Sequence, residues 1–364
     1  MLGVYIHIPF CERKCNYCAF SSFADFSQKT RYIDSLCQEI ESFERKNEHI
    51  DTIYIGGGTP TVLEPFEMEK IFASLKKTFD IDKNSEITVE CNPNSLSREK
   101  LLCYKALGVN RLSIGVQSLN DEQLKFAGRL HNSQQALDSI RLAREIGFEN
   151  ISVDLLIGLN NSNEDEFIKN LKILLDEKIK HISTYMLQVE DKTPLKSLID
   201  QNPDLMPDDD NMVEILLKTA DFLKKNGFLH YEVSNFALKG YESKHNYKYW
   251  SGEEYVGFGL SAHSYLNGER FANASNFEDY FSRKIASREV LTSAQKIEEH
   301  IMLGLRCSLG IDVEFIKSLG YDIQKNSNFQ EFLKRGILFE KGDKICLNED
   351  FYQVNNFVIV SLMP

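Results

Sequence analysis

Short apolar runs and amphipathic segments alternate along the first half of the chain, and this rhythm limits the folds open to it. The segments between the runs repeat apolar residues at helical spacing, as Ile33, Leu36, Ile40 and Phe43 do. Strands that alternate with helices indicate βα units and a parallel sheet. The expected strands are Val4–Ile8, Thr52–Gly56, Glu86–Cys91, Arg111–Val116, Ile151–Ile157 and His181–Leu187.

These strands have one apolar and one polar face. In Ile151–Ile157 the odd-numbered residues are aliphatic, whereas Ser152 and Asp154 lie on the other side. A doubly wound sheet, buried on both faces, would be apolar on both. The pattern therefore favours an α/β fold in which the strands enclose a polar interior. We expect an incomplete (β/α)6 barrel over residues 1–235 and a smaller, mostly α C-terminal domain over residues 236–364, where the alternation fades.

Composition narrows the functional classes. The 364 residues include 42 Lys and Arg against 54 Asp and Glu, a formal net charge of −12, so we expect no nucleic-acid partner. No apolar run approaches the 18 residues of a membrane helix, and the first ten residues lack the basic flank of a signal peptide. We therefore expect a cytoplasmic protein without an integral membrane segment. In that reducing compartment, clustered cysteines indicate metal or redox chemistry.

Three of the eight cysteines lie within eight residues. Cys11, Cys15 and Cys18 form a C-x3-C-x2-C pattern directly after the first strand. A structural zinc site usually needs a second, distant cysteine pair, and the sequence has none. Three thiolates on one loop suit a 4Fe-4S cluster with one iron left open for another ligand. The alternative is three incidental small core residues.

The pattern, with Tyr17 inside it, resembles the signature of the radical S-adenosylmethionine (SAM) superfamily. That resemblance implies a 4Fe-4S cluster on the three cysteines and SAM bound to the fourth iron, where it is cleaved to a radical. Gly57, Gly58 and Thr59, in the segment GGGTP, resemble the superfamily's glycine motif. A glycine backbone there can approach the SAM amino group closely, although a plain tight turn is the alternative.

Further residues resemble one subfamily, the oxygen-independent coproporphyrinogen III oxidases and their relatives. The resemblance implies that SAM contacts Tyr5, near its methionine part, and a set of polar residues at or after strand ends. In that subfamily the carboxylates and the amide contact ribose and methionine, and the arginine binds the SAM carboxylate. The polar residues of this chain are Glu90, Gln117, Arg129 and Asp154.

Two branches of the subfamily differ in function. The oxidases decarboxylate propionates of the heme precursor, whereas the related heme chaperones bind heme and pass it to acceptor proteins. Phe20 stands where the oxidases carry a fourth cysteine, and the cluster follows only ten residues where they have a long N-terminal arm. Both features favour a chaperone without coproporphyrinogen oxidase activity. The oxidase, or a radical SAM enzyme of another class, is the alternative.

The segment HNYKYW resembles a chaperone motif associated with heme. It implies His245 as an axial ligand, with Tyr249 and Trp250 flanking the porphyrin. Ser243 stands where the motif usually has a cysteine, and a hydrogen-bonded core histidine is the alternative role for His245. His263 is a second candidate ligand. The partners implied are heme, acceptors such as respiratory oxidases, a heme-linked homodimer and peripheral membrane contact.

Overall fold

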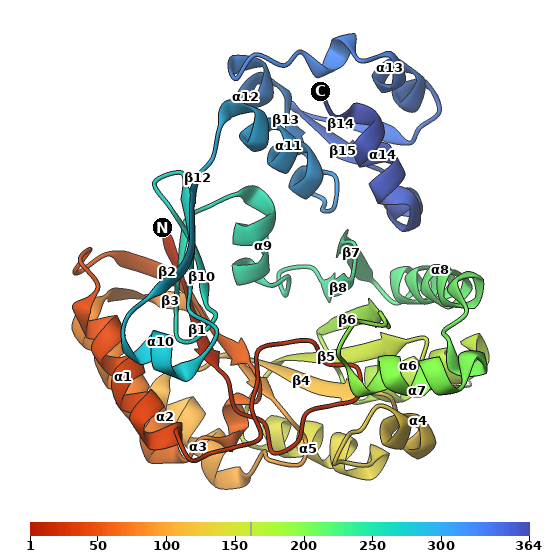
Figure 1. Cartoon of the computed structure of the whole chain (residues 1–364). Helices are drawn as coiled ribbons and strands as arrows, with labels where there is room; N and C mark the ends of the chain where they lie inside the picture. The colour runs from red at the N-terminus through yellow and green to blue at the C-terminus, as the bar shows by residue number, and fades with distance from the viewer. Residues whose placement is uncertain (161) are drawn as a thin grey trace.

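The computed structural model describes residues 1–160 and 162–364 of the chain (Figure 1). All six expected strands are present, with ends that differ by a few residues from the prediction. They are β1 (Leu2–Ile8), β2 (His49–Gly57), β3 (Asp80–Cys91), β4 (Arg111–Gln117), β5 (Asn150–Ile157) and β6 (His181–Met186). The helices between them are α1 (Lys29–Ser42), α2 (Pro65–Thr78), α3 (Arg98–Leu107), α4 (Asp121–Phe126), α5 (Ser133–Glu145) and α6 (Glu164–Asp176).

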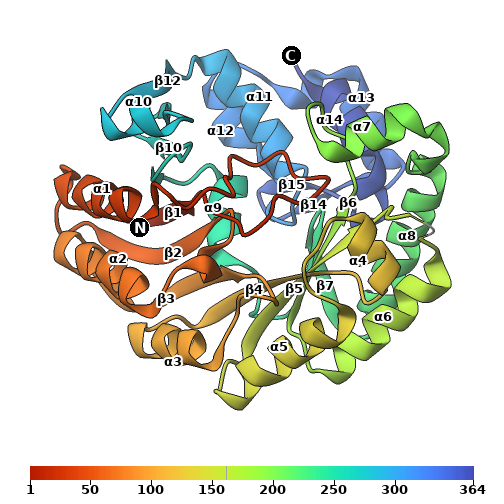
Figure 2. The same cartoon turned by 60° about the horizontal axis from the view of Figure 1, so that its bottom comes forward.

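The six strands run parallel, in chain order, inside a ring of helices (Figure 2). The sheet is open, because further strands extend both of its edges in the order β12-β11-β10-β9-β1-β2-β3-β4-β5-β6-β8-β7. This arrangement confirms the expected incomplete (β/α)6 barrel. After β6 come α7 (Pro194–Gln201), α8 (Asp209–Lys225), β7 (Phe228–Glu232), β8 (Asn235–Leu238) and α9 (Lys244–Ser251).

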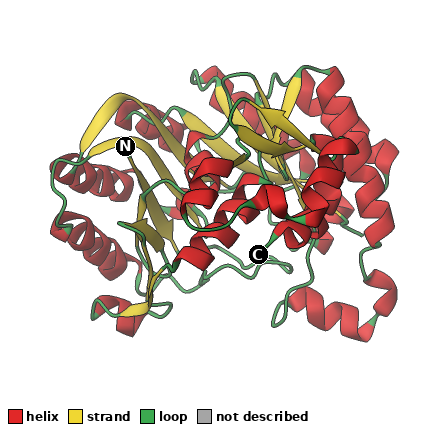
Figure 3. Ribbon diagram, turned by 90° about the horizontal axis from the view of Figure 1, so that it is seen from above, coloured by secondary structure: helices red, strands yellow, loops and turns green. Residues whose placement is uncertain are grey.

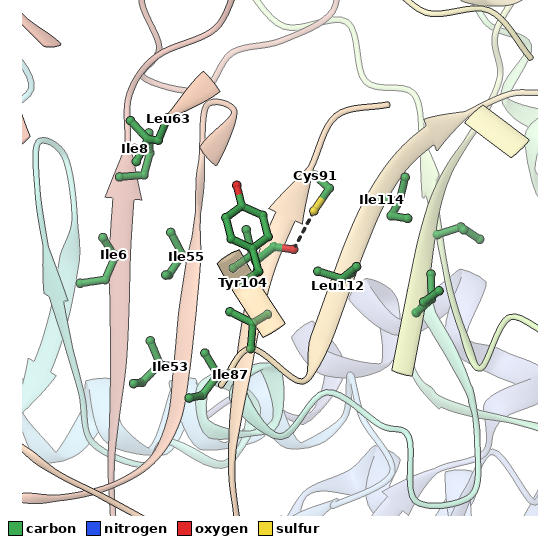
Figure 4. Close-up of a cluster of buried hydrophobic side chains, with 14 of the residues drawn as sticks. Ile6, Ile8, Ile53, Ile55, Leu63, Ile87, Cys91, Tyr104, Leu112 and Ile114 are labelled. Atoms are coloured by element: carbon green, nitrogen blue, oxygen red, sulfur yellow. Dashed lines mark hydrogen bonds between the residues drawn. The ribbon is translucent and has the colours of Figure 1, made fainter. Parts of the chain in front are cut away.

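The outer face of the strands forms the main core. Ile6, Ile53, Leu112 and Ile114 are fully buried beneath the helices, and Tyr104 of α3 packs among them (Figure 4). Cys91 lies in the same layer and donates a hydrogen bond to the Val89 carbonyl, so it is a small core residue. The alternation in the sequence therefore predicts correctly which face of each strand is apolar.

The inner face is polar, and it is buried away from the carboxyl ends of the strands. Arg111 is 2% exposed at the start of β4, and Glu86 of β3 is 5% exposed. Burial opposes the charge of Arg111, but Glu86 and Asp154 among its neighbours hold its pKa above the ordinary value. Glu86 also accepts hydrogen bonds from the backbone amides of Lys244 and His245, at 3.2 and 3.1 Å. The N-terminus of α9 is thereby fixed to the middle of the sheet, where a carboxylate is favourable.

The sheet continues past residue 235. The segment after α9 forms β9 (Tyr255–Phe258), β10 (His263–Leu266), β11 (Glu269–Asn273), α10 (Phe277–Phe281) and β12 (Ile285–Val290). β9 pairs parallel with β1. The buried carboxylate of Glu39 in α1 secures this segment, because it accepts hydrogen bonds from the Gly259 amide, Asn273 and Tyr280 at 2.6–3.0 Å.

A separate, smaller core follows. It is formed by apolar residues between Ile297 and Leu362 and is mostly helical, whereas residues 255–290 of the expected C-terminal domain add strands to the barrel sheet. Its elements are α11 (Ser293–Gly304), β13 (Ile311–Asp312), α12 (Val313–Ser318), α13 (Ser327–Lys334), β14 (Leu338–Lys341), β15 (Lys344–Leu347) and α14 (Asn355–Leu362). Seen from above, helices lie around the strands of the molecule (Figure 3). None of the described helices is long and apolar enough to cross a membrane.

Glu86→Gln should lower the free energy of unfolding by about 2–4 kcal/mol, because Arg111 loses a buried counter-charge and α9 a charged acceptor. Urea denaturation measures the change. The matched variant Glu122→Gln, at an exposed position of α4, should stay within about 0.5 kcal/mol of the parent protein. Equal effects of the two substitutions would contradict this account of the interior.

Candidate functional site

A cavity of about 450 Å³ opens at the carboxyl ends of β1–β6. Active sites of barrels of this kind lie at that end of the strands. We call it the barrel cavity. Most of the residues predicted for the cluster and for SAM line it: Cys11, Cys15, Tyr17, Cys18, Gly57, Gly58, Thr59, Glu90, Gln117, Arg129 and Asp154. Residues far apart in the sequence thus meet around one cavity, as their positions at strand ends predict.

The cysteine loop is held against α4 and β2. The Asn16 amide donates to the Ala127 carbonyl at 3.0 Å, and Asn16 Nδ2 donates to the Phe126 carbonyl at 2.7 Å. Two of the sulfur atoms accept hydrogen bonds, Cys15 Sγ from Arg129 Nη1 and Cys11 Sγ from Thr59 Oγ1, both at 3.4 Å. The hydrogen bond from Thr59 favours the thiolate form of Cys11 over the thiol.

Burial has the opposite effect on the thiols. It raises the pKa of Cys11 and of Cys18, and the hydrogen bond from Thr59 and the charge of Arg129 lower that of Cys11 only in part. Within the described residues, no three His, Cys, Asp or Glu side chains surround one point as ligands of a single metal ion would. The three thiols instead line a wider opening.

Two carboxylates form the floor of the barrel cavity. Glu90 accepts hydrogen bonds from Tyr54 Oη at 2.8 Å and from the Gly57 amide at 3.0 Å, and burial raises its pKa to about 7. Asp154 accepts from Ser113 Oγ at 3.2 Å, and burial raises its pKa as well. Buried carboxylates with raised pKa values mark candidate ligand-binding groups.

Arg129 lines the barrel cavity with these acids. Its guanidinium donates to the Gly115 carbonyl at 2.8 Å and to Asn92, besides Cys15. Gln117 closes the same wall at the end of β4 with a φ of +65°, a left-handed conformation that a non-glycine residue rarely adopts. Such strain is common where a side chain is held in place for a ligand.

The glycine motif brings β2 against its neighbours. A Cβ on Gly58 would lie 2.7 Å from the Phe10 carbonyl oxygen, and one on Gly56 would lie 2.7 Å from the Glu90 carboxyl carbon. Gly57 has a φ of +108° and donates its amide to Glu90. Because these glycines have no side chain, the cysteine loop and Glu90 can approach β2. The resemblance to the SAM glycine motif did not predict this packing role.

Tyr5 is the one predicted SAM residue that does not line the barrel cavity. Its hydroxyl contacts His7 Nδ1 at 3.0 Å, and its ring stacks on Tyr54 with centroids 6.2 Å apart. Tyr54 in turn donates to Glu90. Tyr5 thus lies behind the wall and supports a residue that holds Glu90.

Other wall residues were not among the predicted SAM contacts. Asn92 accepts from Arg129, Ser113 donates to Asp154, and Tyr185 at the end of β6 lines the opening. Asn92 directly follows β3 and Ser113 lies on the polar face of β4, so the same strand-end argument could have included both. Tyr185 carried no such signal, because no motif surrounds it.

His245 lies at the first turn of α9 and is 0% exposed. Its Nδ1 contacts Thr52 Oγ1 and its Nε2 contacts Tyr249 Oη, both at 2.9 Å. Burial, with the charges of Lys248 and Arg111, lowers the pKa of His245 to about 3. Both nitrogens are thus hydrogen-bonded in the core, which is the alternative role considered from the sequence.

Tyr249 and Trp250 line a second cavity, of about 720 Å³. It lies between α9, the strands β9–β11 and the helices α11 and α12. We call it the aromatic cavity, because its walls include Tyr249, Trp250, Tyr255, Tyr265 and Phe315. His263 also lines it. The structure therefore separates the two predicted sites: the cluster and SAM residues line one cavity, and Tyr249 and Trp250 another.

The chain is similar in sequence to a known superfamily and to named proteins. Residues 5–174 match the model of the Radical SAM superfamily. The chain is 35% identical to a heme chaperone HemW of Lactococcus lactis, over 98% of this chain and 96% of that protein. It is 38% identical to a heme chaperone HemW of Bacillus subtilis, over 85% of each chain.

The fold has a solved counterpart. The structure of coproporphyrinogen III oxidase (HemN) from Escherichia coli, a radical SAM enzyme, superposes with a TM-score of 0.85 over 100% of this chain and 90% of that one, at 22% identity. At this identity the likeness concerns the fold. Taken with the near full-length relatives, it shows that the chain belongs to the HemW family of the radical SAM superfamily.

Proposed function

We propose that this protein is a heme chaperone of the cytoplasm, which binds heme and delivers it to heme-dependent proteins. The observation that carries the proposal is similarity to proteins named heme chaperone HemW along nearly the whole chain. The similarity extends through the C-terminal region as well as the barrel. The acceptor class that we propose to test first is the respiratory oxidases.

The barrel cavity suits a 4Fe-4S cluster and SAM. Cys11, Cys15 and Cys18 would hold the cluster, which ordinarily takes four thiolates; three leave one iron for SAM. When bound, the cluster supplies an electron to the SAM sulfonium. Arg129 and Thr59 would stabilise the thiolates, since they already donate to Cys15 and Cys11.

The polar floor and wall of the cavity match the groups of SAM. Glu90 and Asp154 offer acceptors for hydroxyl and ammonium groups, and Gln117 offers an amide. Arg129 is the cation for the SAM carboxylate, because an arginine can bind a carboxylate through two N–H groups. Tyr5 would act through Tyr54 and Glu90 rather than by contact.

The residue Phe20 favours a heme chaperone over an oxidase of the heme precursor. It lines the barrel cavity and is 70% exposed, at the position where the oxidases have a fourth cysteine. An exposed aromatic ring there can contact a partner but cannot replace a thiol.

Cys15→Ala should abolish the brown 4Fe-4S absorbance of the anaerobically reconstituted protein, because the cluster loses one of only three thiolates. Iron and sulfide analysis checks the same loss. Cys103→Ala is the matched control, since Cys103 lies in α3 outside the barrel cavity. A Cys15→Ala protein with full absorbance would refute the cluster assignment.

SAM affinity should rise between about pH 6 and about pH 8, because Glu90, with its pKa of about 7, ionises in that interval and becomes the stronger acceptor. Glu90→Gln should weaken binding about tenfold at the higher pH and reduce this dependence. Equilibrium binding of SAM to the reconstituted protein measures both. Glu122→Gln should retain the pH profile of the parent protein, and an unchanged profile in Glu90→Gln would exclude this role of Glu90.

The reconstituted protein with SAM and a reductant should not convert coproporphyrinogen III to protoporphyrinogen IX, and it should transfer bound heme to an apo-hemoprotein. Anaerobic product analysis and recovery of the acceptor's absorption spectrum measure the two activities. Enzyme-like turnover of coproporphyrinogen III would favour the oxidase instead.

A further inference from the structure

We propose that heme binds in the aromatic cavity, with His263 as the axial ligand of its iron and Lys296 as the partner of a propionate. This inference rests on the proposed heme chaperone function and adds the place and the ligands. It replaces His245 by His263 as the residue that contacts iron. The cavity is separate from the barrel cavity that the cluster and SAM would occupy.

The aromatic cavity has the size and the walls of a site for a large planar ligand. Its volume of about 720 Å³ is within the range of ligand pockets. Tyr249, Trp250, Tyr255 and Tyr265 are each only partly buried, so their rings retain surface for contact. Leu303 and Leu319 add apolar surface from the C-terminal region. Apolar and aromatic walls favour an apolar macrocycle over water.

Of the three imidazoles in or next to this cavity, one is available as a ligand. His245 lies behind Tyr249 with both nitrogens engaged. His300 Nε2 accepts a hydrogen bond from the Asp312 amide at 2.8 Å, which leaves the proton of the neutral ring on Nδ1. His263 is exposed, and no hydrogen bond to its ring is found within residues 1–160 and 162–364. A neutral imidazole with a free nitrogen is the common ligand of heme iron.

Among the described residues, the charges that line the cavity leave one lysine for an anionic group of a ligand. Lys248 is paired with Asp51 and Glu253, and Arg270 is paired with Glu299 at 2.7 Å. Lys296 has no ion pair in the part of the chain that the structure describes. Its Nζ lies beside the β10–β11 turn, 3.6 Å from the position of a Cβ on Gly268. His263 begins β10 and this turn follows its end, so the iron ligand and the ammonium lie at opposite ends of the strand.

A layer of side chains separates the two cavities. Tyr249, on the aromatic side, contacts His245, which stacks on Tyr54 with centroids 5.4 Å apart, and Tyr54 donates to Glu90 of the barrel cavity. Heme in the aromatic cavity would therefore lie apart from the SAM site. That placement suits carriage of an intact porphyrin, since a substrate of radical chemistry must reach the SAM site itself.

Titration of the full-length, reconstituted protein with hemin tests the ligand. His263→Ala should shift the Soret band and weaken binding about tenfold or more, and added imidazole should restore the spectrum. His49→Ala, an exposed histidine at the start of β2, is the matched control and should behave like the parent protein. Quenching of Trp250, the single tryptophan of the chain, provides a second readout of binding.

Lys296→Met tests the propionate partner. It should weaken hemin binding about threefold to fivefold and leave binding of the iron protoporphyrin dimethyl ester, which has no free carboxylates, unchanged. A general loss of folding would weaken both ligands alike. Equal weakening would therefore overturn the role of Lys296.

The outcomes distinguish this inference from the proposed function. A parent protein that does not bind hemin overturns both. A parent protein that binds hemin, with His263→Ala and Lys296→Met unchanged in spectrum and affinity, overturns the site alone and leaves the chaperone function standing. A Soret shift in His263→Ala, restored by imidazole, together with the ester-dependent effect of Lys296→Met, supports the site.

Discussion

The hydrogen bonds from the first turn of α9 to the carboxylate of Glu86 tie the aromatic cavity to the barrel sheet. This carboxylate lies buried in the middle of the sheet, beside the charge of Arg111, and accepts two amides from the first turn of α9. A buried arginine is tolerable only beside such a counter-charge. A helix N-terminus carries partial positive charge, so the same carboxylate fixes where α9 begins. The residues that α9 presents to the aromatic cavity, Tyr249 and Trp250 among them, take their positions from this contact.

The segment from His245 to Trp250 has two different roles within one helix. His245 points into the core, where Thr52 and Tyr249 saturate its nitrogens. Tyr249 and Trp250, one turn further, face the aromatic cavity. The histidine therefore orients a wall of that cavity through its contact with Tyr249. A sequence motif associated with a ligand can thus consist mainly of residues that shape its site.

Local patterns predicted the barrel well, because its six strands alternate faces and their polar residues fall at carboxyl ends. The other elements were harder to predict, because they pair with residues that are far away in the sequence. β9–β12 are only four to six residues long and join the sheet through β1, more than 240 positions away, which no periodicity reveals. The environment of His245 depends on Thr52, which lies 193 positions away in the sequence. The alternation of β1 correctly places Tyr5 on the inner face. Whether its side chain reaches a cavity depends on the neighbouring strands.

The division into two cavities also bears on how a carrier can release its cargo. An iron ligand on an exposed strand end and a single unpaired ammonium give heme two specific attachments and leave the cavity open to solvent. An enclosed site with two axial ligands would hold heme more tightly and release it slowly, since differences in affinity lie mostly in dissociation rates. Transfer of heme to an acceptor requires the opposite balance, with weaker attachment and faster release. Within this fold, the aromatic cavity provides that balance at a place where SAM, Glu90 and the cysteine loop do not contact the porphyrin.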